Sequence, residues 1–230
     1  TRRSSDLSSL TYNAARIQLT KGTAASSTLT LSGTLTRGTN GMATIISSSL
    51  SSDLGSTEKF IVTTTAPANT ASGAGFILAT PSIVGRSSTG ADTNSLNFLR
   101  YDATNGFLLH NATTVGVLSA SAATSLADIT SAQVVVNSTI DVLDLRTNSD
   151  ITAAGGSSLL RIAGGGLIMN GDAGTSAGKT ISSNLRFGTG AAAQEALVFI
   201  SGGQTSDSTI SGNFEAFDFT KAGAGTLLLS

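Results

Sequence analysis

The segment Lys221 to Ser230 reads KAGAGTLLLS, in which small residues and two glycines separate a lysine from a run of threonine and leucine. Glycine suits positions where the chain turns tightly, whereas β-branched and large apolar residues favour strands. Residues 208–219, just before this segment, alternate between apolar and polar side chains, as half-buried strands do. The pattern predicts a tight turn between two short strands, the second over residues 226–229.

Short apolar runs of the same kind recur along the whole chain, separated by clusters of Gly, Asn, Asp, Ser and Thr. The spacing leaves no room for the long helical crossovers of βαβ folds. We therefore predict an all-β protein. The expected strands are residues 29–36, 43–46, 60–65, 76–79, 96–99, 107–109, 115–118, 133–136, 140–145, 159–162, 167–169, 185–187, 197–200, 214–219 and 226–229.

Two all-β architectures fit these strands: a parallel β-helix, or solenoid, and an antiparallel β-sandwich. Antiparallel hairpins favour Asn-Gly turns, and Asn40-Gly41, Asn105-Gly106 and Asn170-Gly171 qualify by sequence, but their flanks do not read as paired strands. A β-helix tolerates loops of unequal length between stacked strands, which matches the irregular spacing. We expect a single-stranded parallel β-helix over residues 1–230 as one domain, with the sandwich as the alternative. Glycines 164–166 and 202–203 are expected at its sharp corners.

The end of the chain resembles a repeat of bacterial autotransporters, the passenger-associated (autotransporter-associated) β-strand repeat. Residues 210–230 carry the likeness, and the matching positions are Lys221, Gly223, Gly225, Thr226, Leu227 and Leu229. The middle glycines of the repeat are replaced by residues 214–219, and Leu29 to Gly33 is a weaker echo of the same ending. The resemblance implies a right-handed parallel β-helix in a secreted or surface-exposed bacterial protein. It implies no particular activity.

Composition narrows the functional classes. The 230 residues carry a net charge of −1, with 12% charged residues, no Cys and no Trp. Basic residues are scattered, so nucleic-acid binding is not expected. No apolar run approaches the ~18 residues that span a bilayer, so we expect no direct membrane insertion by this segment. The absence of Cys suits a surface protein that is secreted unfolded, and the start at Thr1 without Met suggests a piece of a longer protein.

One acidic segment deserves scrutiny as a polysaccharide-cleaving site, because such sites need clustered carboxylates. Asp141, Asp144 and Asp150 lie close in sequence, with Arg146 between them. We expect Asp141, Asp144 and Arg146 to form ion pairs on an outward strand face instead. His110 is the only histidine, and a catalytic grouping with Asp102 would have to assemble in space. We predict no catalytic residues, no metal site and no cofactor.

Two nucleotide-binding patterns occur by sequence. Residues 173–180 fit a loose phosphate-binding loop ending in Lys179-Thr180, and residues 188–193 imitate a dinucleotide fingerprint. Both patterns need a long helix directly afterwards. Residues 181–188 are too short and strand-like to supply it, and residues 191–200, the best helix candidate, end too soon at the glycines 202–203. We interpret both patterns as glycine-rich corners.

Two functional classes remain. The first is a structural or adhesive extracellular element at a bacterial, outer-membrane-associated surface, a rigid rod or fibre that displays loops such as residues 50–59 and 85–94. The second is a carbohydrate-active β-helix that uses the acidic segment. Residues 1–6 are expected to act as a partial cap or tail, whereas residues 227–229 form a bare apolar edge. The expected partners are further coils of the chain or end-to-end copies, and a surface polysaccharide or a ligand on a host or neighbouring cell.

Overall fold

The protein is described by a computed structural model that covers residues 2–47, 54–73, 75–87, 96–170, 177–190, 192–202 and 204–230. The described residues form strands joined by turns and loops, with one 3-10 turn at Leu118–Ala120, so the all-β prediction is confirmed. The chain divides into two compact units. Unit 1 comprises Thr1–Thr70 and Phe76–Asn111, and unit 2 comprises Ala71–Gly75 and Ala112–Ser230. A domain over the whole of residues 1–230 stays a prediction.

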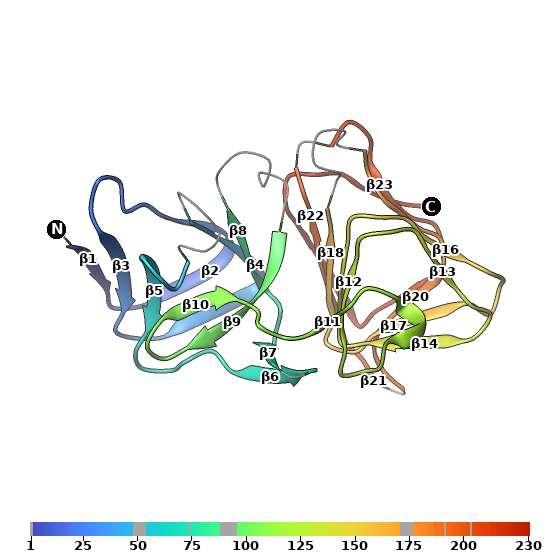
Figure 1. Cartoon of the computed structure of the whole chain (residues 1–230), viewed down its shortest axis with the longest axis horizontal. Coiled ribbons are helices and arrows are strands. Elements are labelled where there is room, and N and C mark those ends of the chain that lie inside the picture. Colours follow the sequence, from blue (N-terminus) through green and yellow to red (C-terminus); the bar gives the residue numbers. More distant parts are fainter. Residues whose placement is uncertain are drawn as a thin grey trace. The chain divides into compact units, whose positions relative to one another are not determined.

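Unit 1 is built largely on two sheets that the chain visits alternately. The first sheet is fully parallel in the order β1-β3-β5 (Figure 1). Its strands are β1 (Arg2–Leu7), β3 (Ser26–Leu31) and β5 (Glu58–Val62). The second sheet has the order β10-β9-β8-β4-β2, and its strands are β2 (Leu10–Leu19), β4 (Leu35–Ser47), β8 (Ile83–Ser87), β9 (Leu96–Asp102) and β10 (Gly106–Leu109). A further two-stranded sheet pairs β6 (Asn69–Ser72) with β7 (Gly75–Leu78), where the chain leaves unit 1 after Thr70 and returns to it at Phe76.

Parallel and antiparallel pairing meet in the second sheet of unit 1. Strands β2, β4 and β8 are parallel, whereas β9 runs antiparallel to both β8 and β10. The Asn105-Gly106 dipeptide forms the turn of the β9–β10 hairpin, so the expectation that its flanks are unpaired was wrong. Asn40-Gly41 lies instead in a bulge of β4, where Asn40 takes a positive φ of 53°. Gly171 of the third dipeptide lies outside the described residues.

Unit 2 consists of three sheets that the chain visits in turn, and one passage through all three is called a rotation. The first contains β11 (Thr114–Val115), β12 (Leu126–Ile129), β15 (Asp144–Thr147), β18 (Gly166–Met169), β22 (Glu195–Ile200) and β25 (Asp218–Ala222). The second contains β13 (Gln133–Val135), β16 (Ile151–Ala153), β19 (Thr180–Ile181), β23 (Ser208–Ile210) and β26 (Leu227–Leu229). The third contains β14 (Thr139–Val142), β17 (Leu159–Ile162), β20 (Asn184–Thr189) and β24 (Phe214–Glu215), with β21 (Ala192–Ala193) antiparallel to β20.

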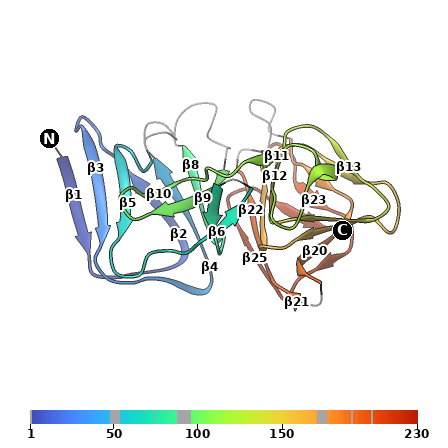
Figure 2. The same ribbon diagram turned by 60° about the horizontal axis from the view of Figure 1, so that its bottom comes forward.

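From β12 onward, each strand other than β21 that is followed by a further rotation pairs in parallel with the strand one rotation later, whereas β11 pairs with the next strand, β12, of its own sheet. Figure 2 shows unit 2 from a second direction. In the first sheet, Ala127 pairs with Leu145, Leu145 with Leu167, Leu167 with Val198 and Val198 with Lys221, so the rotations take 18, 22, 31 and 23 residues. Parallel pairing dominates in both units, which counts against the antiparallel sandwich.

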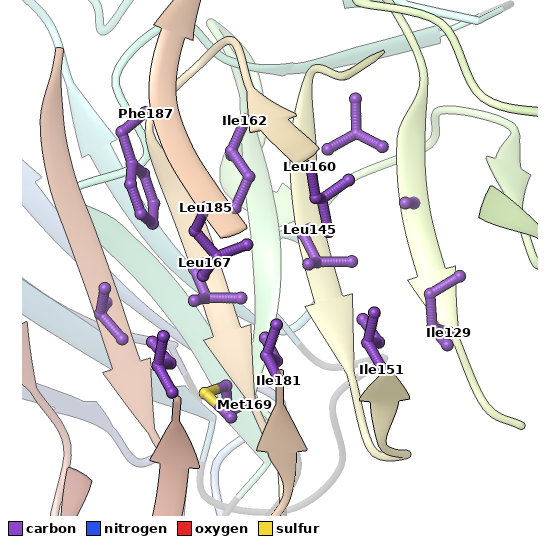
Figure 3. Packing of buried hydrophobic residues seen from close by; sticks show 14 of the residues in the cluster. Ile129, Leu145, Ile151, Leu160, Ile162, Leu167, Met169, Ile181, Leu185 and Phe187 are labelled. Carbon is purple, nitrogen blue, oxygen red and sulfur yellow. The ribbon is translucent and has the colours of Figure 1, made fainter. Parts of the chain in front are cut away.

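A single apolar cluster fills the interior of unit 2. Alternate residues of each strand face inward, as in β14, where Ile140 and Val142 are buried and Thr139 is exposed. Because pairing is in register, like residues stack in rows: Figure 3 shows Ile151 next to Ile181 and Leu145 next to Leu167. Burying such side chains contributes roughly 1.5–3 kcal/mol each, so the rows hold consecutive rotations together.

Unit 1 has its own core, in which three aromatic residues pack against one another. The ring of Phe107 lies 5.3 Å from that of Phe60 and 5.2 Å from that of Tyr101. The buried Tyr101 hydroxyl donates to the Val62 carbonyl (2.8 Å) and accepts from the Val62 amide (2.7 Å), so its polar end is satisfied. These contacts join β5 to the β9–β10 hairpin.

Several local expectations were wrong. Residues 1–6 do not form a tail, because β1 takes up Arg2–Leu7. Residues 191–200 contain no helix in their described part but the strands β21 and β22. The apolar runs 29–36, 140–145 and 214–219 are each divided between two strands. In the corner at 164–166 only Gly165 has a positive φ (+87°). Gly203 and the loop residues 50–53 and 88–94 lie outside the described residues.

Candidate functional site

The acidic segment of unit 2 runs through strands β14 and β15, and its first carboxylate points outward. Asp141 receives two hydrogen bonds from Arg161 of β17, from Nε to Oδ1 (2.5 Å) and from Nη2 to Oδ2 (2.8 Å). The two residues are directly opposite in the parallel register. The partner of Asp141 therefore lies on the next rotation and not within the acidic segment.

Arg146 also forms its ion pair with a residue of a neighbouring rotation. Its Nη1 atom lies 2.8 Å from Oδ1 of Asp128 on β12, again directly opposite in register. The expected ion pairs on an outward face thus exist for Asp141 and Arg146, but with partners outside the acidic segment.

Asp144 departs from the expectation, because it is buried (1% exposed) where an outward-facing ion pair was predicted. Its Oδ1 accepts a hydrogen bond from the Gly166 amide at 2.7 Å. The corner residue Gly164 makes room for the carboxyl, since a Cβ there would lie 2.7 Å from Oδ1. Burial raises the pKa of Asp144 well above its usual range, and the Gly166 hydrogen bond only partly opposes this rise.

Asp150 bonds to the backbone of strand β19. Its Oδ1 accepts a hydrogen bond from the Thr180 amide (2.8 Å), which ties the beginning of β19 to the preceding rotation. Asp141, Asp144 and Asp150 therefore have three separate partners. Over the described residues, no group of three or more His, Asp or Glu side chains is arranged to hold a metal ion.

His110 and Asp102 lie at opposite ends of the β9–β10 hairpin. The His110 amide bonds to the Phe98 carbonyl, whereas Gly106 pairs with Asp102. Four residues of strand separate the two positions, roughly 13 Å at the usual rise. The Asp102 carboxylate accepts the amides of Thr104 and Asn105 in the turn, and these bonds lower its pKa. The pair is not assembled as a catalytic dyad.

The two nucleotide patterns lack the helix that they need. Thr180 begins strand β19, and residues 173–176 of the loose phosphate loop lie outside the described residues. In the second pattern, Gly188 and Thr189 end β20, and the chain turns back to pair them with Ala193 and Ala192. Without a helix N-terminus neither segment has the field and donors that hold a phosphate.

The KAGAGTLLLS segment does form the expected turn between strands. Gly223 has a φ of +83°, and a Cβ there would lie 2.0 Å from the Ile200 carbonyl oxygen. A Cβ at Gly225 would likewise collide with the Ser201 carbonyl oxygen, at 2.2 Å. The Lys221 ammonium donates to the carbonyls of Gly223 and Gly225, so the lysine closes the turn. Desolvation by burial lowers the Lys221 pKa.

A charged row on the third sheet of unit 2 was not foreseen. Asp141, Arg161, Arg186 and Glu215 occupy matching outward positions on β14, β17, β20 and β24. Arg186 Nε lies 3.4 Å from Glu215 Oε1. Arginines 161 and 186 are therefore adjacent, each with a carboxylate on its far side. Only knowledge of the register could have revealed the row, because its members are separated by some 20 to 30 residues in sequence.

No family model matches the chain, and comparisons with curated proteins and with solved structures likewise gave no match. Among the described residues, no helix is long and apolar enough to cross a membrane.

Proposed function

We propose that this chain is a structural or adhesive extracellular element of a bacterial cell surface, built on a right-handed parallel β-helix. The observation that supports this most is the repeated passage of unit 2, from β12 onward, through three mainly parallel sheets around one core. A chain wound in this way is stabilised by contacts between successive rotations. Such a body is stiff and suits the display of loops.

The similarity of residues 210–230 to the autotransporter repeat supports a surface location, and the absence of cysteine is consistent with it. Intact bacteria that produce the parent protein should be labelled by an antibody against this segment. Labelling only after the cells are permeabilised would contradict the proposed location.

Mechanical and proteolytic resistance follows from the same winding. Strands that are paired on both sides present little accessible backbone to a protease. Proteinase K should leave residues from Ala112 onward largely intact in the native chain and degrade them after thermal unfolding. Equal cleavage rates within the strands of native and unfolded protein would count against a rigid rod.

The carbohydrate-active alternative gains no support from the acidic segment, whose three carboxylates have separate partners. Incubation with a panel of polysaccharides tests it directly. We expect no release of reducing ends. Release that is lost in Asp144→Asn, which keeps an acceptor for the Gly166 amide, would overturn the structural proposal.

The proposed partners of this element are further rotations of the same chain or a second copy. Strands β25 and β26 are edge strands of their sheets. Phe219 and Leu229 are paired with the core residues Ala196 and Ile210, yet they are 36% and 48% exposed. An edge with core-type side chains is suited to pairing with another strand. A surface polysaccharide or a ligand on a host or neighbouring cell remains the proposed adhesive target.

A further inference from the structure

Unit 1 contains a pocket of about 410 Å³ that was not among the sequence-based expectations. One side is formed by strands β2, β4 and β8, and the other by residues 65–68 and 78–80. A hydrogen bond from the Ala79 amide to the Ala68 carbonyl (2.9 Å) holds the two loops together. The volume lies in the range of sites that bind small molecules.

The walls of this pocket are mainly apolar. Leu78 and Ile83 are each 4% exposed, and Leu35 and Pro67 complete the apolar lining. Such walls favour a ligand with a hydrocarbon or aromatic body, because burying that body removes apolar surface from water.

Polar groups gather at one side of the pocket. The Tyr12 hydroxyl lies 2.8 Å from Ser82 Oγ, and both residues are buried. Arg37 stands opposite Tyr12 in the register of β2 and β4, at the last pair before the bulge. Its Nε donates to the Gly41 carbonyl across that bulge (2.6 Å), which fixes the guanidinium.

The charge on the described pocket lining is positive. Arg37 is the only charged residue among its described lining residues, and none of them is acidic. Burial raises the Tyr12 pKa, although the Ser82 hydrogen bond and the Arg37 charge oppose the rise, so the hydroxyl stays neutral at pH 7. A neutral hydroxyl pair beside a guanidinium can donate to an anionic oxygen.

We propose that this pocket binds a small monocarboxylate with an apolar body, the carboxylate facing Arg37 and the body lying against Leu78 and Ile83. The guanidinium geometry matches a carboxylate, and the walls suit a short alkyl chain or one aromatic ring. This binding site is independent of the structural role proposed for unit 2.

NMR titration of the ¹⁵N-labelled chain with benzoate and hexanoate tests the proposal. Both acids should shift the amides of β4 and of the non-proline residues in 65–68 and 78–83 in a saturable way. Benzamide and hexanamide match the shapes without the charge, and glucuronate matches the charge without the apolar body. All three should bind at least about tenfold more weakly.

Variants locate the site. Arg37→Gln should weaken benzoate binding about tenfold, and Ala79→Phe should abolish it by filling the pocket. Arg16→Gln is the matched control, because Arg16 is an exposed residue of β2 that bonds to Gln18. This variant should bind benzoate as the unaltered chain does. Equal binding of acid and amide by the unaltered chain, shifts that map elsewhere, or no saturable shift below about 10 mM acid would each overturn the proposal.

Discussion

At the scale of single residues, Asp144 is placed where a carboxylate is poorly solvated. It is enclosed by the glycine corner 164–166 and has one hydrogen-bond donor, the Gly166 amide. A raised folded-state pKa means that the folded protein binds the proton more tightly than the unfolded chain. This contribution to stability is fully present below the unfolded pKa of about 4 and is lost as the pH rises toward the folded pKa.

Asp144→Asn should therefore stabilise the protein at pH 7 relative to the unaltered chain. The amide cannot ionise, and its oxygen can still accept the Gly166 hydrogen bond. Urea unfolding at several pH values measures the effect. The gain should shrink as the pH falls toward about 4. An equal gain at both ends of this range would show that ionisation of Asp144 does not matter.

The turn glycines should differ sharply in their tolerance of a side chain. Gly223→Ala should cost at least about 2 kcal/mol, because the residue has a positive φ and its Cβ would collide with the Ile200 carbonyl. Gly156→Ala is the control, since nothing lies within 4 Å of that position and no unusual φ is required. Urea midpoints followed by circular dichroism compare the two. A loss of the same size at both positions would contradict the steric argument.

At the scale of the elements, sequence was informative where a strand alternates cleanly and its ends are marked. Residues 159–162 were predicted with both ends correct, as β17. The sequence predicts one strand over Ile140 to Leu145, because no glycine or proline marks the corner at Leu143. That corner shifts the alternation by one residue, so that Leu145 follows Val142 into the core and Asp144 comes to lie under the glycine corner.

Other strands carry no clear apolar pattern in the sequence, because they are held as strands by hydrogen bonds to their neighbours and not by their own composition. Strand β19 has two residues, and β1 is polar over most of its length, yet each is fixed by a parallel neighbour. The ion pairs Asp141–Arg161 and Asp128–Arg146 escaped prediction for the same reason. Sequence thus indicated the class and many strands, whereas contacts between rotations needed the register.

The charged row should make the stability of one variant depend on salt concentration. Asp141→Asn should cost about 0.5–1 kcal/mol, because it removes an ion pair and leaves Arg161 beside Arg186 without its carboxylate. Asp128→Asn is the control, because its partner Arg146 has Ile168 as its next neighbour in register. Salt screens the arginine pair, so the loss measured by urea unfolding should fall more steeply with NaCl in Asp141→Asn. Equal salt slopes would contradict this account.

At the scale of the whole molecule, the two units differ in how their parallel sheets end. In unit 1 the parallel sheet β2-β4-β8 is continued by antiparallel strands β9 and β10. In unit 2 the rows of core residues continue through every rotation to β25 and β26. There the inner side chains Phe219 and Leu229 have no further row to contact within the described residues, although Ala196 and Ile210 in the preceding row are buried.

This edge should make the chain associate as its concentration rises. A second copy that pairs with β26 would cover Leu229 and satisfy the open backbone groups of the edge. Sedimentation velocity over a range of concentrations measures the effect. Leu229→Asp, at a core-facing position, should abolish the association, because a carboxylate would have to be buried between the copies. Leu228→Asp is the matched control: that residue is equally exposed (48%) but is paired with the partly exposed Thr209 on the outer face, so it should leave association intact. A chain that sediments as a monomer at every concentration, or an equal loss in the two variants, would refute pairing at this edge.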